Sequence, residues 1–238
     1  MKAVVNTGAG QASASRRKAA TTIGIDDLFG DTSLLGCQEL AEGAVVLHGK
    51  ALPWETAIRS ALEGITILSP FRHMMTPGGF TMSVAMTNCG QVGWITDQTG
   101  YRYDRADPST GCEWPKMPGC FVDLAMAAAA DAGYPDFVPD ACLINKYEPG
   151  ARLTLHQDKN ETEFTHPIVS VSLGLPATFL FGGLKRNDPT LKVKLQHGDV
   201  VVWGGSSRLR YHGVTELKEG EHELLGRMRL NLTFRRAL

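Results

Sequence analysis

Two histidines and a carboxylate are the residues of this chain best suited to chemistry. His156-Gln157-Asp158 and the later His212 lie where alternating strand patterns are ending. This ligand set is that of a facial triad, which holds a non-haem Fe(II) by three protein atoms and leaves three coordination positions open. Because His156 and Asp158 have the same parity on an extended segment, both can face one metal ion. The spacing therefore predicts a site where Fe(II) meets O2 and a co-substrate.

A row of polar side chains follows near the end of the chain. In Met228-Arg229-Leu230-Asn231-Leu232-Thr233-Phe234-Arg235, apolar and polar residues alternate strictly, so on a strand the polar ones share a face. These polar residues are Arg229, Asn231, Thr233 and Arg235. A guanidinium fork matches the geometry of a carboxylate. The row predicts a receptor for a dicarboxylate, and beside an iron site this indicates 2-oxoglutarate as the co-substrate.

A third segment lies just upstream of His156. In Ala141-Cys142-Leu143-Ile144-Asn145-Lys146-Tyr147, alternation places Asn145 and Tyr147 on one face. Either could hydrogen-bond a bound carboxylate, although a tyrosine at a strand end more often packs. Taken alone, His-x-Asp is commonly a surface loop, and an alternating polar row is commonly a solvated face. The combination of these motifs is what favours a catalytic site.

The bulk composition is that of an ordinary globular chain. The 238 residues are 43% hydrophobic and 21% charged, with a net charge of −1, so any site for a polyanion must be a local patch. The five cysteines are odd in number and form no CxxC pair, which favours reduced thiols and a cytoplasmic protein. Since no apolar run is long enough to cross a membrane, a membrane is not expected as a partner.

Helical patterns precede a long series of strand patterns. A helix is expected from Pro53 to about Gly64 and another over 121–132, with a strand over 80–87 and an irregular binding loop or lid over 88–114. Later strands are expected over 141–147, 168–173, 178–181, 191–196, 199–203 and 228–235. This order predicts an α+β protein in which helices cover one face of a sandwich or barrel.

Residues 1–25 contain no acid and are expected to form a disordered basic tail, although their composition is also similar to that of an organellar transit peptide.

The motifs together resemble those of the AlkB family, the Fe(II)- and 2-oxoglutarate-dependent nucleic-acid demethylases. The resemblance covers roughly residues 26–236, which indicates one domain over 26–238. It is carried by Asn145-x-Tyr147, His156-Gln157-Asp158, Phe181-Gly182-Gly183-Leu184-Lys185-Arg186, His197-Gly198-Asp199-Val200, Tyr211-His212-Gly213 and Arg229-x-Asn231-Leu232-Thr233-Phe234-Arg235.

The resemblance implies a fold and a set of roles. The fold would be α+β, a double-stranded β-helix (jelly-roll) core with N-terminal helices packed outside and a nucleotide-recognition lid at about 70–115. Iron would be held by His156, Asp158 and His212. The two carboxylates of 2-oxoglutarate would be bound by Arg229 and Arg235, with Asn145, Tyr147 and Asn231 as hydrogen-bonding neighbours. Trp94 would stack on the target base, and Tyr101 and Arg186 would contact the substrate.

The same resemblance implies oxidative demethylation of N-alkylated bases such as 1-methyladenine and 3-methylcytosine. The expected partner is alkylated single- or double-stranded DNA, with RNA as a further substrate, and the protein is expected to act as a cytoplasmic monomer. Local cations for the phosphates would come from Arg72, His73, Lys146, Lys159, Lys185, Arg186, Arg208 and Arg210. One alternative is the same chemistry on a protein side chain or a small molecule. A second is a non-enzymatic nucleic-acid-binding module whose triad holds a structural metal, although structural sites are usually closed and tetrahedral.

Asn160 departs from the pattern of the bacterial proteins that the chain resembles, which commonly have an acid there. Its parity with His156 and Asp158 predicts that its side chain faces the same pocket. An asparagine keeps an acceptor oxygen but loses the charge that attracts a cationic base. Glu161 or Glu163 would compensate if the loop bent toward the pocket. Without such compensation, the chain would favour cationic lesions less strongly over neutral ones such as 1-methylguanine.

Overall fold

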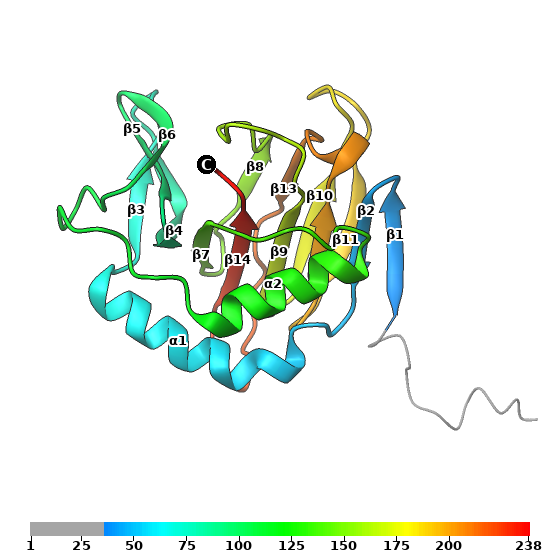
Figure 1. Ribbon diagram of the computed structural model, residues 1–238, viewed down its shortest axis with the longest axis horizontal. Helices are drawn as coiled ribbons and strands as arrows, with labels where there is room; N and C mark the ends of the chain where they lie inside the picture. The colour runs from blue at the N-terminus through cyan, green and yellow to red at the C-terminus, as the bar shows by residue number, and fades with distance from the viewer. Residues whose placement is uncertain (1–35) are drawn as a thin grey trace, which may run out of the picture. The chain divides into compact units, whose positions relative to one another are not determined.

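The computed structural model describes residues 36–238, so the predicted tail at 1–25 and the predicted start of the domain at 26 lie outside the described residues. Within this range the strands form an eight-stranded sheet, a four-stranded sheet and a hairpin, with antiparallel neighbours throughout (Figure 1). In sheet order, the major sheet contains β1 (Cys37–Ala41), β2 (Ala44–Leu47), β12 (Val200–Trp203), β9 (Ile168–Gly174), β14 (Arg229–Arg235), β7 (Ala141–Tyr147), β4 (Thr81–Gly90) and β3 (Arg72–Met75).

The smaller sheet packs on the inner face of the major one. It contains β11 (Leu191–Leu195), β10 (Ala177–Phe181), β13 (His212–Val214) and β8 (Leu153–His156). One apolar cluster joins the two sheets, with Ile168 and Trp203 from the major sheet and Phe179 and Val214 from the smaller sheet. Two sheets that share such a core form a sandwich, and the inner face of each strand then points into it.

Two helices lie against the outer face of the major sheet, as Figure 1 shows: α1 (Glu55–Leu68) and α2 (Gly119–Asp131). Ile58 of α1 and Phe121 of α2 share an apolar cluster with Leu232 and Phe234 of β14. The rings of Phe121 and Phe234 meet edge to face with centroids 5.8 Å apart. The apolar residues of β14 therefore face the helices, which leaves its polar residues for the inside of the sandwich. Within residues 36–238 no helix is long and apolar enough to span a membrane.

The predicted end of the first helix at Gly64 is wrong. Helix α1 continues to Leu68, and its buried face includes Leu62 and Ile65 on either side of the glycine. Glycine in a helix interior costs roughly 0.5–1 kcal/mol relative to alanine. Burial of two large apolar side chains outweighs that cost, because each contributes about 1.5–3 kcal/mol.

The expectation of an irregular segment over 88–114 is also wrong in part. It contains the end of β4 and a hairpin of β5 (Gly93–Asp97) and β6 (Gly100–Asp104), which lies beside β3 and β4 in Figure 1. At the turn, the Asp97 carboxylate accepts hydrogen bonds from the backbone N–H and the hydroxyl of Thr99. Gly100 follows with φ +131°, a conformation that favours glycine. The sequence Asp-Gln-Thr-Gly at 97–100 is typical of a turn and could have indicated this hairpin.

Candidate active site

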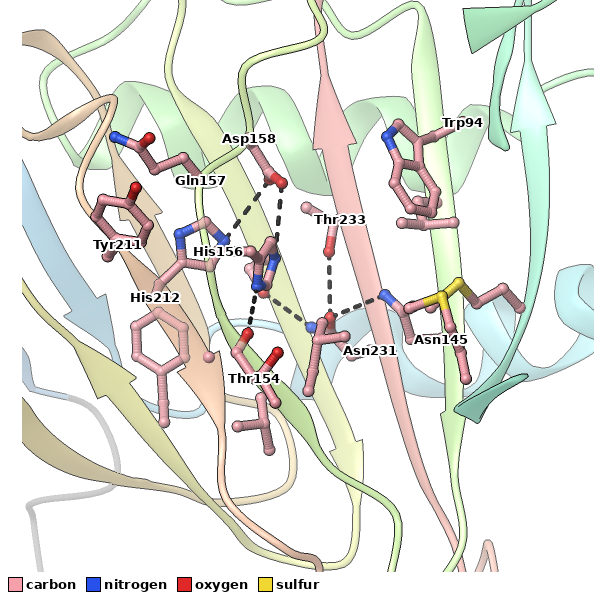
Figure 2. Close-up of a pocket in the computed structure, with 18 of the residues that line it drawn as sticks. Trp94, Asn145, Thr154, His156, Gln157, Asp158, Tyr211, His212, Asn231 and Thr233 are labelled. Atoms are coloured by element: carbon pink, nitrogen blue, oxygen red, sulfur yellow. Dashed lines mark hydrogen bonds and ion pairs between the residues drawn. The ribbon is translucent and has the colours of Figure 1, made fainter. Parts of the chain in front are cut away.

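Strand pairing brings the two predicted histidines together. His156 ends β8, His212 begins β13, and the two residues are direct partners in the antiparallel register. Their ring centroids are 4.4 Å apart. Asp158 lies just beyond the end of β8, with Oδ1 3.7 Å from His156 Nε2 and Oδ2 3.8 Å from His212 Nε2 (Figure 2). One ligand atom from each of the three residues lies within 4.8 Å of the others, so the trio could hold a metal ion.

Backbone carbonyls fix the tautomer of both histidines. His156 Nδ1 lies 2.8 Å from the Thr154 carbonyl oxygen, and His212 Nδ1 lies 3.1 Å from that of Arg210. Because a carbonyl oxygen only accepts, each Nδ1 carries the proton and donates it. The lone pair of each neutral ring is then on Nε2, the atom that faces Asp158, and this is the atom a metal ion requires.

The charges of the trio also suit a cation. Burial, and then the neighbouring His156, lower the pKa of His212 to about 3, so its ring is neutral at pH 7. Burial alone would raise the pKa of the Asp158 carboxyl, but Arg235 and the two histidines hold it well below its usual range. The site therefore offers the neutral ring of His212 and one carboxylate at physiological pH, with Nε2 of His156 beside them.

The polar row of β14 lines the same cavity. Its volume is about 350 Å³, within the usual range for a small-molecule site, and Arg229, Asn231, Thr233 and Arg235 all contribute to its wall. Antiparallel pairing places Tyr147 of β7 opposite Arg229, and Asn145 opposite Asn231. Asn145 Nδ2 lies 3.4 Å from Asn231 Oδ1, a contact drawn in Figure 2. The predicted polar face and its two predicted neighbours are thus brought together by one strand pair.

The two arginines of the row have different partners. Arg229 is 1% exposed and donates from Nη2 to the Ser172 hydroxyl at 2.8 Å, while its Nε and Nη1 have no hydrogen-bond partner. Among the described residues no acid forms an ion pair with it. Burial lowers the pKa of Arg229, as expected for a cation without a counter-ion, although Tyr147 opposes that effect. An unbalanced buried cation is costly unless an anion joins it.

Arg235, in contrast, is already paired with acids. Its Nη2 and Nε lie 2.5 and 2.9 Å from Asp158 Oδ2, and Nε lies 3.4 Å from Glu161 Oε1. The third nitrogen, Nη1, is buried without a partner. Arg235 therefore belongs to the metal end of the cavity and keeps one donor group for a ligand there.

All four predicted substrate contacts line this cavity: Trp94, Tyr101, Asn160 and Arg186. The rings of Trp94 and Tyr101 stack with centroids 5.7 Å apart. Trp94 Nε1 donates to Asn160 Oδ1 at 3.1 Å, and Arg186 Nη1 donates to the Leu155 carbonyl at 2.6 Å. Figure 2 shows Trp94 on one side of the cavity and the histidine pair on the other. An aromatic plane thus lies across the cavity from the histidine pair.

Some neighbours of the trio have roles that the sequence did not indicate. Glu161 is buried between Arg208 and Arg235 and accepts from the Tyr103 hydroxyl, and Glu163 lies 3.2 Å from His166, so neither acid substitutes for a charge at Asn160. Arg208 is 3% exposed, so it is not the phosphate contact that was expected. These residues follow no strand pattern, and only the folded loop brings them together.

The sequence matches a known family of oxygenases over most of its length. Residues 43–235 match the model of the 2OG-Fe(II) oxygenase superfamily. The chain is 57% identical to the alpha-ketoglutarate-dependent dioxygenase AlkB of Escherichia coli strain K12, over 89% of this chain and 97% of that protein. It belongs to the AlkB family of this superfamily. The predicted family is confirmed, and the protein is an Fe(II)- and 2-oxoglutarate-dependent dioxygenase that also uses O2.

More distant AlkB relatives agree in sequence and in fold. An AlkB homolog of Caulobacter vibrioides is 45% identical over 71% of this chain and 76% of its own length. The tRNA demethylase abh1 of Schizosaccharomyces pombe is 33% identical over 52% of this chain and 41% of its own. The structure of OsALKBH1 superposes with a TM-score of 0.74 at 30% identity, covering 84% of this chain and all of that one. The predicted jelly-roll fold is therefore confirmed.

Proposed function

We propose that the chain repairs nucleic acid by oxidative demethylation of N-alkylated bases, with 1-methyladenine and 3-methylcytosine as substrates. The observation that carries this proposal is one cavity that combines the His-Asp-His trio, an unpaired buried arginine and an aromatic plane. Relatives named as DNA N(6)-methyladenine demethylase and tRNA demethylase support a nucleobase as substrate. The net reaction converts the N-methyl base, 2-oxoglutarate and O2 to the unmethylated base, formaldehyde, succinate and CO2.

His156, Asp158 and His212 are the proposed ligands of the iron. The donor set fits, because each Nδ1 is engaged by a backbone carbonyl, which leaves Nε2 as the ligand atom of both histidines, and the carboxylate is ionised. Bound Fe(II) supplies the oxidising chemistry that removes hydrogen from the methyl group. The protein's part is to present the three donor atoms on one side and to leave the other side open to the cavity.

Arg229 is the proposed receptor for the 2-oxoglutarate carboxylate that lies far from the metal. It occupies the end of the β14 row opposite to Arg235, and its unpartnered Nε and Nη1 can donate to both oxygens of a carboxylate. Tyr147 and Asn145 lie beside it on β7 and can add hydrogen bonds, with Asn231 opposite Asn145. Arg235 would use its free Nη1 for the carboxylate next to the iron.

Trp94 is the proposed platform for the damaged base. A base inside a duplex is unreachable, so it must rotate out and lie between planar groups. Stacking on an aromatic ring contributes about 1–3 kcal/mol per base, and Tyr101 extends the surface beside Trp94. Arg186, at the same cavity wall, is proposed to contact the substrate strand. DNA, single- or double-stranded, is the proposed partner, with RNA as a further one.

The trio and the β14 row belong to one chain, so the proposed reaction does not need a second copy. The five cysteines are free thiols, which supports a reducing compartment such as the cytoplasm.

Formaldehyde release from a methylated oligonucleotide tests the proposed function. With Fe(II) and 2-oxoglutarate present, the natural chain should release formaldehyde, and His212→Ala should release none. His222→Ala is the matched control, because His222 stacks on His197 away from the cavity wall. An excess of methylated peptide should not compete with the oligonucleotide. Turnover of the peptide in preference to the oligonucleotide would replace the proposal with the protein-directed alternative.

A further inference from the structure

The β5–β6 hairpin is attached to the loop that follows Asp158 by two neighbouring hydrogen bonds. Trp94 and Tyr103 are direct partners across the hairpin, so their side chains lie on the same face. Trp94 Nε1 donates to Asn160 Oδ1 at 3.1 Å, and the Tyr103 hydroxyl donates to Glu161 Oε1 at 2.7 Å. One cross-strand pair of the hairpin therefore donates hydrogen bonds to two consecutive residues of the loop.

Glu161 is the centre of a buried group of charges. It is 7% exposed, and its carboxylate lies 3.2 Å from Arg208 Nη2 and 3.4 Å from Arg235 Nε. Together with Asp158, two acids and two arginines balance one another away from solvent. Burial raises the pKa of Tyr103 well above its usual value, so the phenol stays protonated and remains a donor to this group.

The same two arginines hold Asp158 at both of its acceptor groups. Arg208 Nη1 donates to the Asp158 backbone carbonyl at 2.8 Å, and Arg235 Nε donates to the carboxylate at 2.9 Å. Glu161 therefore contacts Arg208 and Arg235, and both of these arginines hold Asp158. A continuous path of contacts runs from Tyr103 on the hairpin through Glu161 and Arg235 to the proposed iron ligand.

We propose that Glu161 is a positioning residue that couples docking of the β5–β6 hairpin to the geometry of the metal-facing carboxylate of Asp158. This inference rests on the proposed function, since it takes Asp158 as an iron ligand and Trp94 as the platform for the base. When the hairpin is docked, Tyr103 and the two arginines share Glu161 and fix Asp158. When it is undocked, Glu161 loses a partner and both arginines can shift.

The consequence is that a seated base and a competent iron site favour each other. Coupling of this kind is reciprocal, so whatever fills the metal site must also stabilise the docked hairpin. A base stacked on Trp94 would in turn hold Asp158 in its ligating position. The undocked state would hold the iron ligand less well, so 2-oxoglutarate oxidised in that state would be consumed without demethylation of a base.

Hydrogen exchange in the hairpin tests the coupling without any turnover. Mn²⁺ with 2-oxoglutarate serves as the probe, and exchange of amides 93–104 is measured with and without it. In the natural chain the probe should slow exchange, and in Tyr103→Phe the slowing should shrink severalfold. Tyr134→Phe is the matched control, because it also loses one phenol hydrogen bond, to the Gly43 carbonyl at 2.9 Å, far along the chain from the hairpin. Equal slowing in all three proteins, or none in the natural chain, would overturn the inference.

The ratio of formaldehyde to succinate provides the second test. In Tyr103→Phe and in Glu161→Gln this ratio should fall severalfold, because 2-oxoglutarate is consumed without demethylation. The melting temperature of Tyr103→Phe should fall no further than that of Tyr134→Phe, which separates coupling from stability. An unchanged ratio in Tyr103→Phe would overturn the inference even if Glu161→Gln failed to fold. A natural chain that released succinate but no formaldehyde would instead overturn the proposed function.

Discussion

Asn160 offers the base a hydrogen-bond donor. The indole N–H of Trp94 can only donate, so Asn160 Oδ1 must be the atom that faces it, and the orientation of the amide is fixed. The NH2 group is then left for a base in the cavity. The sequence predicted a neutral acceptor at this position, but the structure shows that the acceptor is already used by Trp94. An NH2 group suits the carbonyl oxygen of a lesion such as 1-methylguanine better than the amino group of a cationic lesion.

Asn160→Asp should therefore raise the ratio of activity on 1-methyladenine to activity on 1-methylguanine. One carboxylate oxygen would accept from Trp94 and the other from the amino group of the base. A charged hydrogen bond exceeds a neutral one by about 1 kcal/mol, which corresponds to roughly fivefold in the ratio. Matched oligonucleotides carrying each lesion provide the measurement. A ratio that stays constant or falls would show that residue 160 does not contact the base.

Arg229→Met should weaken the use of 2-oxoglutarate and leave base recognition intact. Loss of a charge-assisted contact of about 1.5–3 kcal/mol corresponds to a rise of roughly 10- to 100-fold in KM for 2-oxoglutarate. Arg227→Met is the control, since Arg227 is exposed and pairs with Glu219 at the surface. If both variants had the KM of the natural chain, Arg229 would not be the receptor.

At the scale of elements, the sequence predicted long patterned strands best. β7 has the predicted bounds, and β14 differs from its prediction by one residue, because strict alternation is a signal along the chain itself. The pairing of His156 with His212 was not predictable, since β8 and β13 are short and their register depends on residues far apart in sequence. The contacts of Glu161 were not predictable either, because they also join residues far apart in sequence. Local patterns indicate which side chains share a face, but only tertiary packing determines which faces meet.

Gly64→Ala tests the corrected length of α1. Apart from the neighbouring residues and the backbone of its own helix, no atom lies within 4 Å of the position that an added Cβ would occupy, and the residue is in a helical conformation. Alanine should therefore stabilise the fold by about 0.5–1 kcal/mol in urea denaturation, with activity unchanged. Gly213→Ala is the contrasting variant, because its Cβ would lie 2.7 Å from the Leu153 carbonyl oxygen and should weaken the β8–β13 pair. A loss of stability in Gly64→Ala would mean that the helix is interrupted there.

For the molecule as a whole, ligand binding should raise the free energy of unfolding. Mn²⁺ with 2-oxoglutarate at a hundred times their dissociation constants should stabilise the fold by about 2.7 kcal/mol. For a chain of this size that raises Tm by about 5–10 °C. The rise should vanish in His156→Ala and persist in His222→Ala, as read by thermal denaturation. A rise of the same size in His156→Ala would place the metal elsewhere.

Oxidative demethylation restores the damaged base without removing it from the strand. The most direct measurement is the mass of an oligonucleotide carrying one 1-methyladenine, recorded before and after incubation with the protein, Fe(II), 2-oxoglutarate and O2. Direct demethylation should give a product lighter by the mass of one CH2 group, with one formaldehyde and one succinate formed for each repaired base. An unchanged oligonucleotide, a product that gains oxygen and keeps it, or an abasic product would contradict direct demethylation.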